Sequence, residues 1–341
     1  MNQINLGGGR SPLVTIAVPV YRVEPFIERC ARSLFEQTYD NLEFVFVDDA
    51  TPDNSIQVLE RVILDYPERA PHVRILHHEA NRGLVQTRNT LVENAKGDFI
   101  CHVDSDDWME LNAVELLVSR QLETGADIIT GNAYIHNENG KGVYRSGGWN
   151  LDKETMLEKL LKGELSVELW RKLISRKLYV EHEVKGDTDI SYLEDYLVFP
   201  RLVYFAESVA GIENYTYHYD YRNSQSLMHV ASRDFRLYMQ SYVAVFSRLT
   251  DFFADKENRW KDALNVKKVM IYHYMMLKAA YLRDRENYNR CKNLLKQTDS
   301  RFWYRVRWDK SFFRKLESNY FLAGKTYPIR KFLQRLKQYY A

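Results

Sequence analysis

Short apolar segments alternate with amphipathic ones through the first 130 residues, and this alternation restricts the fold more than any other feature of the chain. Between the apolar segments, hydrophobic residues recur at helical spacing, as over residues 26–35 and 84–95. The apolar segments contain few polar residues, so helices are expected to cover both faces of a parallel α/β sheet. The predicted strands are 14–20, 42–47, 73–77, 99–103 and 127–130.

Two glycines follow predicted helices and are expected to end them. Gly97 comes shortly after the helix predicted over 84–95, and Gly125 follows the helix predicted over 111–123. Glycine is favoured just past a helix because it adopts a left-handed backbone without a steric penalty.

The composition is that of a globular protein, with 45% hydrophobic and 28% charged residues among 341. A formal net charge of +2 gives no sign of a nucleic-acid partner. Cys30, Cys101 and Cys291 lack the spacing of a zinc site or a disulfide framework, which favours a reducing compartment. Residues 1–11 are not a signal peptide, and no apolar run is long enough to span a membrane. The expected location is therefore cytoplasmic.

An acid cluster, Asp104, Asp106 and Asp107, follows the fourth predicted strand directly. Carboxylates packed this densely repel one another unless a cation neutralises them, and Mg²⁺ or Mn²⁺ prefers oxygen ligands. The alternative is a solvated turn that caps the next helix, since Asp is a favoured N-cap. The position at the carboxyl end of a strand favours the metal site, because ligands bind there in parallel α/β sheets.

Two further polar groups end neighbouring strands. Tyr21 follows the first predicted strand, and Asp48 and Asp49 end the second. The acid pair can form a loop stabilised by Asx turns, or Asp49 can accept hydrogen bonds from a nucleobase.

Several sequence blocks, in a fixed order across roughly residues 12–130, resemble family 2 of the glycosyltransferases. They are Val-Pro-Val-Tyr at 18–21, the helix end at 33–39, the acidic turn at 47–55, the Asn-Arg-Gly loop and its continuation at 81–89, and the segment 97–108 with the acid cluster. The resemblance implies the A-type glycosyltransferase fold, with a Rossmann-like, mostly parallel sheet. It also implies an inverting transferase that uses a nucleotide-sugar, such as a UDP-sugar, and Mn²⁺ or Mg²⁺.

The resemblance also implies roles for individual residues. Asp106 would ligate the metal, and Asp104 would contact the metal or the ribose. Arg22 and Ala50 depart from the family pattern, which often has Asn and Gly there. The residues implied at the nucleotide are Pro19, Val20, Tyr21, Glu24, Asp49, Arg88 and Asp104.

Later in the chain, a Glu-Asp pair resembles the family's catalytic acids. Asp195 would take the proton from the acceptor hydroxyl, with Glu194 as the second candidate. Alternatively, both acids favour the first turn of a helix through its dipole. His218 or Arg222 could contact the diphosphate, or both could be ordinary surface residues.

The chain is expected to divide into a catalytic domain over 12–225 and a helical, basic region over 226–341. The catalytic domain would hold the nucleotide-sugar half at 12–130 and the acceptor half at 131–225. From Arg301 onward, eleven Lys and Arg residues stand against two acids. This tail at 301–341 is either a packed helical subdomain or a peripheral membrane contact at the inner face. The acceptor would be a saccharide or a lipid-linked saccharide, as in polysaccharide biosynthesis.

Two other classes of function fit the sequence less well. A phospho-Asp receiver would be about one third as long, and a phosphatase would need Thr where Trp108 stands. A non-catalytic nucleotide-sugar or glycan-binding module would tolerate the loss of Asp106 or Asp195, yet both are present.

Overall fold

The computed structural model describes residues 11–138, 140–144, 150–223, 234–299 and 301. The chain divides into two compact units, which are described separately. The first comprises Met1–Leu157 and Leu165–Ser241, and the second comprises Glu158–Glu164 and Tyr242–Ala341.

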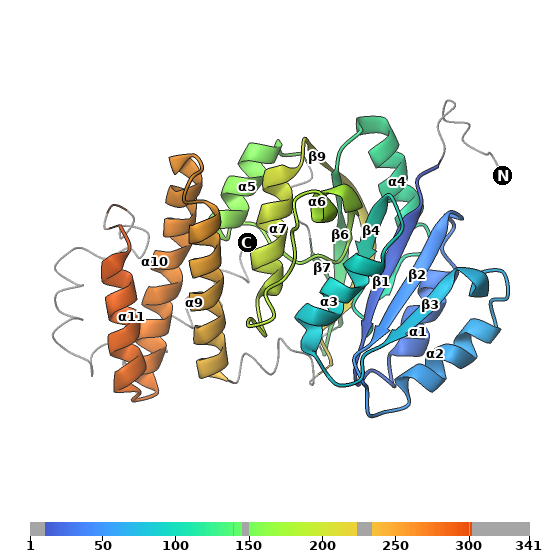
Figure 1. Cartoon of the computed structure of the whole chain (residues 1–341), viewed down its shortest axis with the longest axis horizontal. Helices are drawn as coiled ribbons and strands as arrows, with labels where there is room; N and C mark the ends of the chain where they lie inside the picture. The colour runs from blue at the N-terminus through green and yellow to red at the C-terminus, as the bar shows by residue number, and fades with distance from the viewer. Residues whose placement is uncertain (1–10, 139, 145–149, 224–233, 300, 302–341) are drawn as a thin grey trace. The chain divides into compact units, whose positions relative to one another are not determined.

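The described strands of the first unit form one mixed sheet in the order β3-β2-β1-β4-β8-β6-β9-β5, with β7 paired to β6 (Figure 1). Strands β1 to β4 are mutually parallel, as predicted. Beyond β4 the sheet is mixed, because β8 runs antiparallel between β4 and β6. The strands are β1 (Val14–Val20), β2 (Leu42–Asp48), β3 (Val73–His77), β4 (Phe99–His102), β5 (Trp108–Met109), β6 (Ile128–Asn137), β7 (Gly140–Tyr144), β8 (Lys172–Ser175) and β9 (Val209–Asp220).

Helices cover both faces of the sheet. Apolar residues of α1, α2 and α4 pack in one core with Ile16 and Val18 of β1, while α3 packs on β1 and β2. The helices of this unit are α1 (Ile27–Phe35), α2 (Ser55–Leu64), α3 (Gly83–Asn94), α4 (Ala113–Thr124), α6 (Arg176–Val180) and α7 (Glu194–Phe205), with a short 3-10 helix at Ala70–His72. The predicted α/β class is confirmed.

The two glycines differ in their roles. Gly125 ends α4 at φ +69, as predicted. The prediction for Gly97 is wrong, because α3 ends at Asn94 and its C-cap residue is Ala95. A Cβ on Gly97 would lie 2.7 Å from the Thr15 nitrogen and 2.8 Å from the Leu13 carbonyl oxygen, so Gly97 permits close backbone packing instead.

The C-terminal region is helical, as predicted. Helices α5 (Lys153–Lys162) and α9 (Phe235–Phe252) cross the boundary between the units, and α10 (Asn258–Tyr281) packs on α11 (Arg285–Gln297). No helix in the described ranges has both the length and the apolarity needed to cross a membrane. The basic tail at 302–341 lies outside the described residues, so the membrane contact stays a prediction.

The buried carboxylate of Glu43 connects three segments near the start of the sheet. It accepts from Thr15 Oγ1 at 2.5 Å, from the N–H groups of Lys96 (2.5 Å) and Gly97 (3.1 Å), and from Arg74 at 3.0 Å. Burial would raise the pKa of Glu43, but these bonds outweigh it and lower the pKa below its ordinary value. Glu43 is therefore expected to stabilise the fold as an anion.

We predict that Glu43→Ala lowers the free energy of unfolding at pH 7 by about 3 kcal/mol, because it leaves several buried donors unpaired. Because folding lowers the pKa of Glu43, the loss is full above the ordinary Glu pKa of about 4.3 and shrinks as the pH falls below it. Urea unfolding at pH 7 and at pH 3.5 (roughly one unit below that value) measures this difference. Glu60→Ala, on the exposed side of α2, is the control. An equal loss at both pH values would contradict the prediction.

Candidate active site

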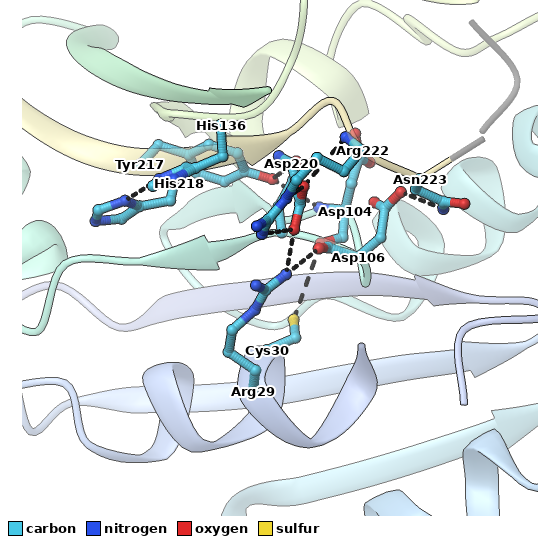
Figure 2. Close-up of polar contacts among 11 residues, drawn as sticks. Arg29, Cys30, Asp104, Asp106, His136, Tyr217, His218, Asp220, Arg222 and Asn223 are labelled. Atoms are coloured by element: carbon cyan, nitrogen blue, oxygen red, sulfur yellow. Dashed lines mark hydrogen bonds and ion pairs between the residues drawn. The ribbon is translucent and has the colours of Figure 1, made fainter. Parts of the chain in front are cut away.

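The acid cluster follows β4 and is held by the end of β9 (Figure 2). The Asp104 N–H donates to Tyr217 Oη at 3.0 Å. Asp107 is fully buried, and its carboxylate accepts from Tyr217 Oη at 2.8 Å and from the Asp220 N–H at 2.7 Å. The alternative that the acid cluster caps the next helix is wrong, because the N-cap of α4 is Asn112 and β9 engages the Asp107 carboxylate.

Arg88 of α3 lies buried among three carboxylates from distant parts of the sequence. Its Nη2 donates to Asp104 Oδ1 at 2.7 Å, and its Nη1 donates to Asp195 Oδ1 at 2.6 Å and to Glu194. Burial disfavours the charged form, but the charges of Asp195, Asp104 and Glu194 outweigh it and raise the pKa of Arg88. The guanidinium therefore connects the acid cluster with the predicted base, while its contact with a nucleotide stays a prediction.

Asp195 and Glu194 occupy the first turn of α7. Leu193, the N-cap residue of α7, has a left-handed backbone with φ +71. Burial raises the pKa of Asp195 well above its ordinary value; Arg88 opposes this, while Glu194 and Asp104 add to it. A carboxyl group with a raised pKa suits general acid–base chemistry, because proton transfer is most effective when the pKa approaches the working pH.

Asp106 contacts two residues that the sequence did not single out. Its Oδ2 accepts from Asn223 Nδ2 at 2.8 Å, and its carbonyl oxygen accepts from Arg29 Nη2 at 2.9 Å. Burial, and then the charge of Asp104, raise the pKa of Asp106 to about 6, although Asn223 opposes them. Arg29 and Asn223 carried no sequence signal, since neither belongs to a motif with metal-ligand spacing.

The donor set at the acid cluster fits Mg²⁺ or Mn²⁺ held jointly with a substrate. Asp104 and Asp106 are crowded carboxylates, and a cation would relieve their repulsion. Among the described residues, no group of three or more His, Cys, Asp or Glu is arranged to hold a metal by itself. Mg²⁺ is commonly bound by one or two carboxylates together with substrate phosphates, and two carboxylates are present here.

The predicted nucleotide residues lie at the ends of β1 and β2. Pro19 and Val20 are buried at the end of β1, and Tyr21 follows with 38% of its surface exposed. Glu24 accepts from the Asn54 N–H at 3.0 Å and so holds the turn that precedes α2. Tyr21 is therefore the member of this group that offers a ring to a ligand.

Both departures from the family pattern have left-handed backbones. Arg22 has φ +54 and Ala50 has φ +53, a conformation that costs a residue with a Cβ some strain. The Arg22 N–H donates to Thr51 Oγ1 at 2.7 Å, which holds this turn. The Arg22 guanidinium lies 5.3 Å from the centroid of the Tyr21 ring. Ala50 thus adopts a backbone conformation that the glycine common in the family would adopt without strain.

Asp49 is buried, and both of its oxygens are bonded. Oδ1 accepts from the Arg82 N–H at 2.8 Å and lies 2.7 Å from His78 Nδ1, while Oδ2 accepts from the Gly83 N–H at 2.8 Å. These bonds fix the start of α3. A carboxylate offers about four acceptor positions, so the predicted bond to a nucleobase would use the remaining one.

His218 and Arg222 lie in different surroundings. His218 Nε2 lies 2.8 Å from a Glu110 carboxylate oxygen, and its ring stacks on Trp108 at 4.7 Å. Arg222 forms an ion pair with Asp220 at 2.7 Å, close to the acid cluster. Of the two, Arg222 is therefore the better placed to meet a diphosphate bound at that cluster.

Sequence comparisons relate this chain to known glycosyltransferases. The profile of Glycosyl transferase family 2 matches residues 15–181. The uncharacterized glycosyltransferase EpsJ of Bacillus subtilis is 34% identical over 54% of this chain and 54% of its own length. Chondroitin synthase of Pasteurella multocida is 35% identical over 41% of this chain and 14% of its own length. The chain thus matches about half the length of EpsJ and much less of the synthase.

Solved structures share the fold at low sequence identity. S. aureus TarS 1–349, in complex with UDP-GlcNAc, has a TM-score of 0.70 at 16% identity, covering 93% of this chain and 91% of that chain. The mannosyltransferase PcManGT of Pyrobaculum calidifontis, in complex with GDP-Man and Mn²⁺, has a TM-score of 0.55 at 15% identity, covering 93% and 87%. The fold is that of the A-type glycosyltransferases. Through residues 15–181, the chain belongs to glycosyl transferase family 2.

Proposed function

We propose that this chain is an inverting glycosyltransferase that moves a sugar from a nucleotide-sugar to a hydroxyl group of a saccharide or lipid-linked saccharide. The observation that carries the proposal is the contact of Arg88 with Asp104 on one side and with Asp195 and Glu194 on the other. A transferase needs a donor-diphosphate site and a base within reach of one reacting carbon. Arg88 contacts both the candidate metal ligand Asp104 and the candidate base Asp195.

At the donor end, Asp104 and Asp106 would hold Mn²⁺ or Mg²⁺. When bound, such an ion supplies Lewis-acid stabilisation of the leaving diphosphate. Tyr21 would line the nucleotide pocket with Pro19, Val20 and Glu24. Asp49 would accept from the base. The UDP-GlcNAc bound by TarS and the GDP-Man and Mn²⁺ bound by PcManGT support a donor of this class.

At the acceptor end, Asp195 would accept the proton of the attacking hydroxyl as the hydroxyl oxygen bonds to the anomeric carbon. The bond from that carbon to the diphosphate oxygen breaks in the same step, and the nucleoside diphosphate leaves. A single displacement of this kind inverts the anomeric centre. Arg88 would hold the Asp195 carboxylate in place through its 2.6 Å bond. Glu194, which is bonded to the same guanidinium nitrogen, is the second candidate for the base.

The similarity to EpsJ and to chondroitin synthase supports a role in polysaccharide synthesis. The acceptor is then a growing glycan or a lipid-linked saccharide. A cytoplasmic location, with the tail at 301–341 contacting the inner face of a membrane, would suit a lipid-linked acceptor.

We predict that Asp106→Ala lowers Mn²⁺-dependent turnover of a UDP-sugar at least 100-fold, because the metal loses a carboxylate ligand. Calorimetric titration of Mn²⁺ in the presence of UDP should show weaker metal binding by a similar factor. Asp40→Ala removes a carboxylate whose side chain is 98% exposed and serves as the matched control. Near wild-type turnover in Asp106→Ala would remove this residue from the metal site.

Asp195→Asn is expected to lower kcat about 10³-fold while changing the Kd for the donor less than about twofold, since a general base contributes 10²–10⁴-fold to the chemical step. Turnover with a saccharide acceptor and equilibrium binding of UDP-sugar separate the two effects. Glu194→Gln, in the same turn, shows whether the neighbouring acid substitutes. If Asp195→Asn instead weakens donor binding and spares kcat, the base lies elsewhere.

The raised pKa of Asp195 also predicts a pH dependence. A base must be deprotonated, so kcat should fall as the pH decreases through the pKa of Asp195, and the raised pKa moves this limb well above the ordinary Asp value of about 4. The pH profile of kcat at saturating donor and metal measures it. The limb should be absent from the residual activity of Asp195→Asn; its persistence there would assign it to another group.

A further inference from the structure

Arg29 lies on α1 and reaches the acid cluster from outside the predicted motifs (Figure 2). Its Nη2 donates to the carbonyl oxygen of Asp106 at 2.9 Å and forms an ion pair with Asp220 Oδ2 at 3.0 Å. One guanidinium nitrogen thus serves both the acid cluster and the end of β9. The guanidinium carbon also lies over the Trp108 ring, 3.7 Å from its centroid, so the side chain packs against an aromatic surface.

The partner of Arg29, Asp220, is kept as an anion. Its side chain is almost completely buried, which would raise its pKa, but hydrogen bonds from Arg222 and Arg29 outweigh this and lower the pKa of Asp220 to about 2. The Asp220 N–H donates to Asp107 Oδ1 at 2.7 Å. Asp220 therefore contacts the acid cluster through its backbone and Arg29 through its side chain.

These contacts hold the acid cluster through its backbone and through Asp107. Tyr217 receives the Asp104 N–H, Arg29 donates to the Asp106 carbonyl, and β9 engages the Asp107 carboxylate. The Asp106 carboxylate itself accepts from Asn223. The backbone that carries the two predicted metal ligands is thus fixed by groups that would not touch the metal.

We infer that Arg29 is a positioning residue for the metal site: together with Asp220, it fixes the backbone that carries the Asp104 and Asp106 carboxylates. The presence of a metal rests on the proposed function. The position of Arg29 beside the acid cluster rests on the contacts described above. Residues that support metal ligands in this way typically change metal affinity 10–100-fold when replaced.

The chemistry of arginine suits this position. A planar guanidinium can stack on Trp108 and donate to two acceptors at once, whereas lysine presents a point charge on a flexible stem. Arg29→Lys should therefore retain part of the ion pair with Asp220 and lose the fixed orientation. Arg29→Met should lose both.

The experiment compares the full-length chain with Arg29→Lys, Arg29→Met and Asp220→Asn. Arg32→Met is the matched control, because Arg32 lies on the same helix but pairs with Glu28 and Asp65. Two quantities are measured: hydrogen exchange of peptides covering 104–109 in the metal-free protein, and the affinity for Mn²⁺ in the presence of UDP from calorimetric titration. Peptides covering β2 report any global loss of stability.

Arg29→Met is expected to speed exchange at 104–109 about tenfold or more and to weaken Mn²⁺ binding by at least tenfold, with Arg29→Lys intermediate and Arg32→Met unchanged. Unchanged exchange and unchanged affinity in Arg29→Met would overturn the inference. If Arg29→Met unfolds, the same comparison in Arg29→Lys and Asp220→Asn decides: faster exchange confined to 104–109 supports positioning, and uniform change across β2 contradicts it. If the wild-type chain binds no Mn²⁺ in the presence of UDP, the metal assignment of the proposed function fails, and the exchange data alone decide the role of Arg29.

Discussion

The pairing of one buried guanidinium with three carboxylates governs the site. Arg88 is a charge removed from water, and an unpaired charge there would cost several kcal/mol, on the order of the penalty for breaking a buried ion pair. The carboxylates that pair with it are Asp104, which follows β4, and Glu194 and Asp195 of α7. Because the donors of a guanidinium have fixed directions, this pairing also fixes the separation of the acids. The fold must therefore bring α3, the end of β4 and the start of α7 together.

The sheet topology makes this meeting possible. The parallel strands β1, β2 and β4 end on one rim, where Tyr21, Asp49 and Asp104 stand. On the other side of β4, the antiparallel strand β8 leads into α6 and then to α7, which carries Asp195. The antiparallel strand β8 is thus part of the connection that brings Asp195 to the rim where the parallel strands end.

The sequence predicted the local parts of this arrangement and not the long-range contacts. β1 and β3 have the predicted bounds, and β2 and β4 differ by one residue, because buried apolar runs signal strands directly. Gly97 was misread, since a helix end and a close backbone approach both favour glycine. Arg29 of α1 and Asn223, which follows β9, contact the acid cluster only through the tertiary fold, and no spacing along the chain indicates such contacts. The polar strand ends were predictable, but the groups that hold them were not.

The balance of charge supports the divalent cation proposed for this site. Acidic side chains from the acid cluster, Asp220 and α7 outnumber the arginines that pair with them, which are Arg29, Arg88 and Arg222. Among the described residues, each of these arginines already forms an ion pair with a carboxylate. Among the described side chains of the site, a nucleotide diphosphate would therefore meet more acidic than basic groups, and Coulomb repulsion in a partly buried site is weakly screened. A metal ion held by Asp104 and Asp106 would reverse the sign of that interaction. The same carboxylates that would repel a donor alone would then bind it with its metal.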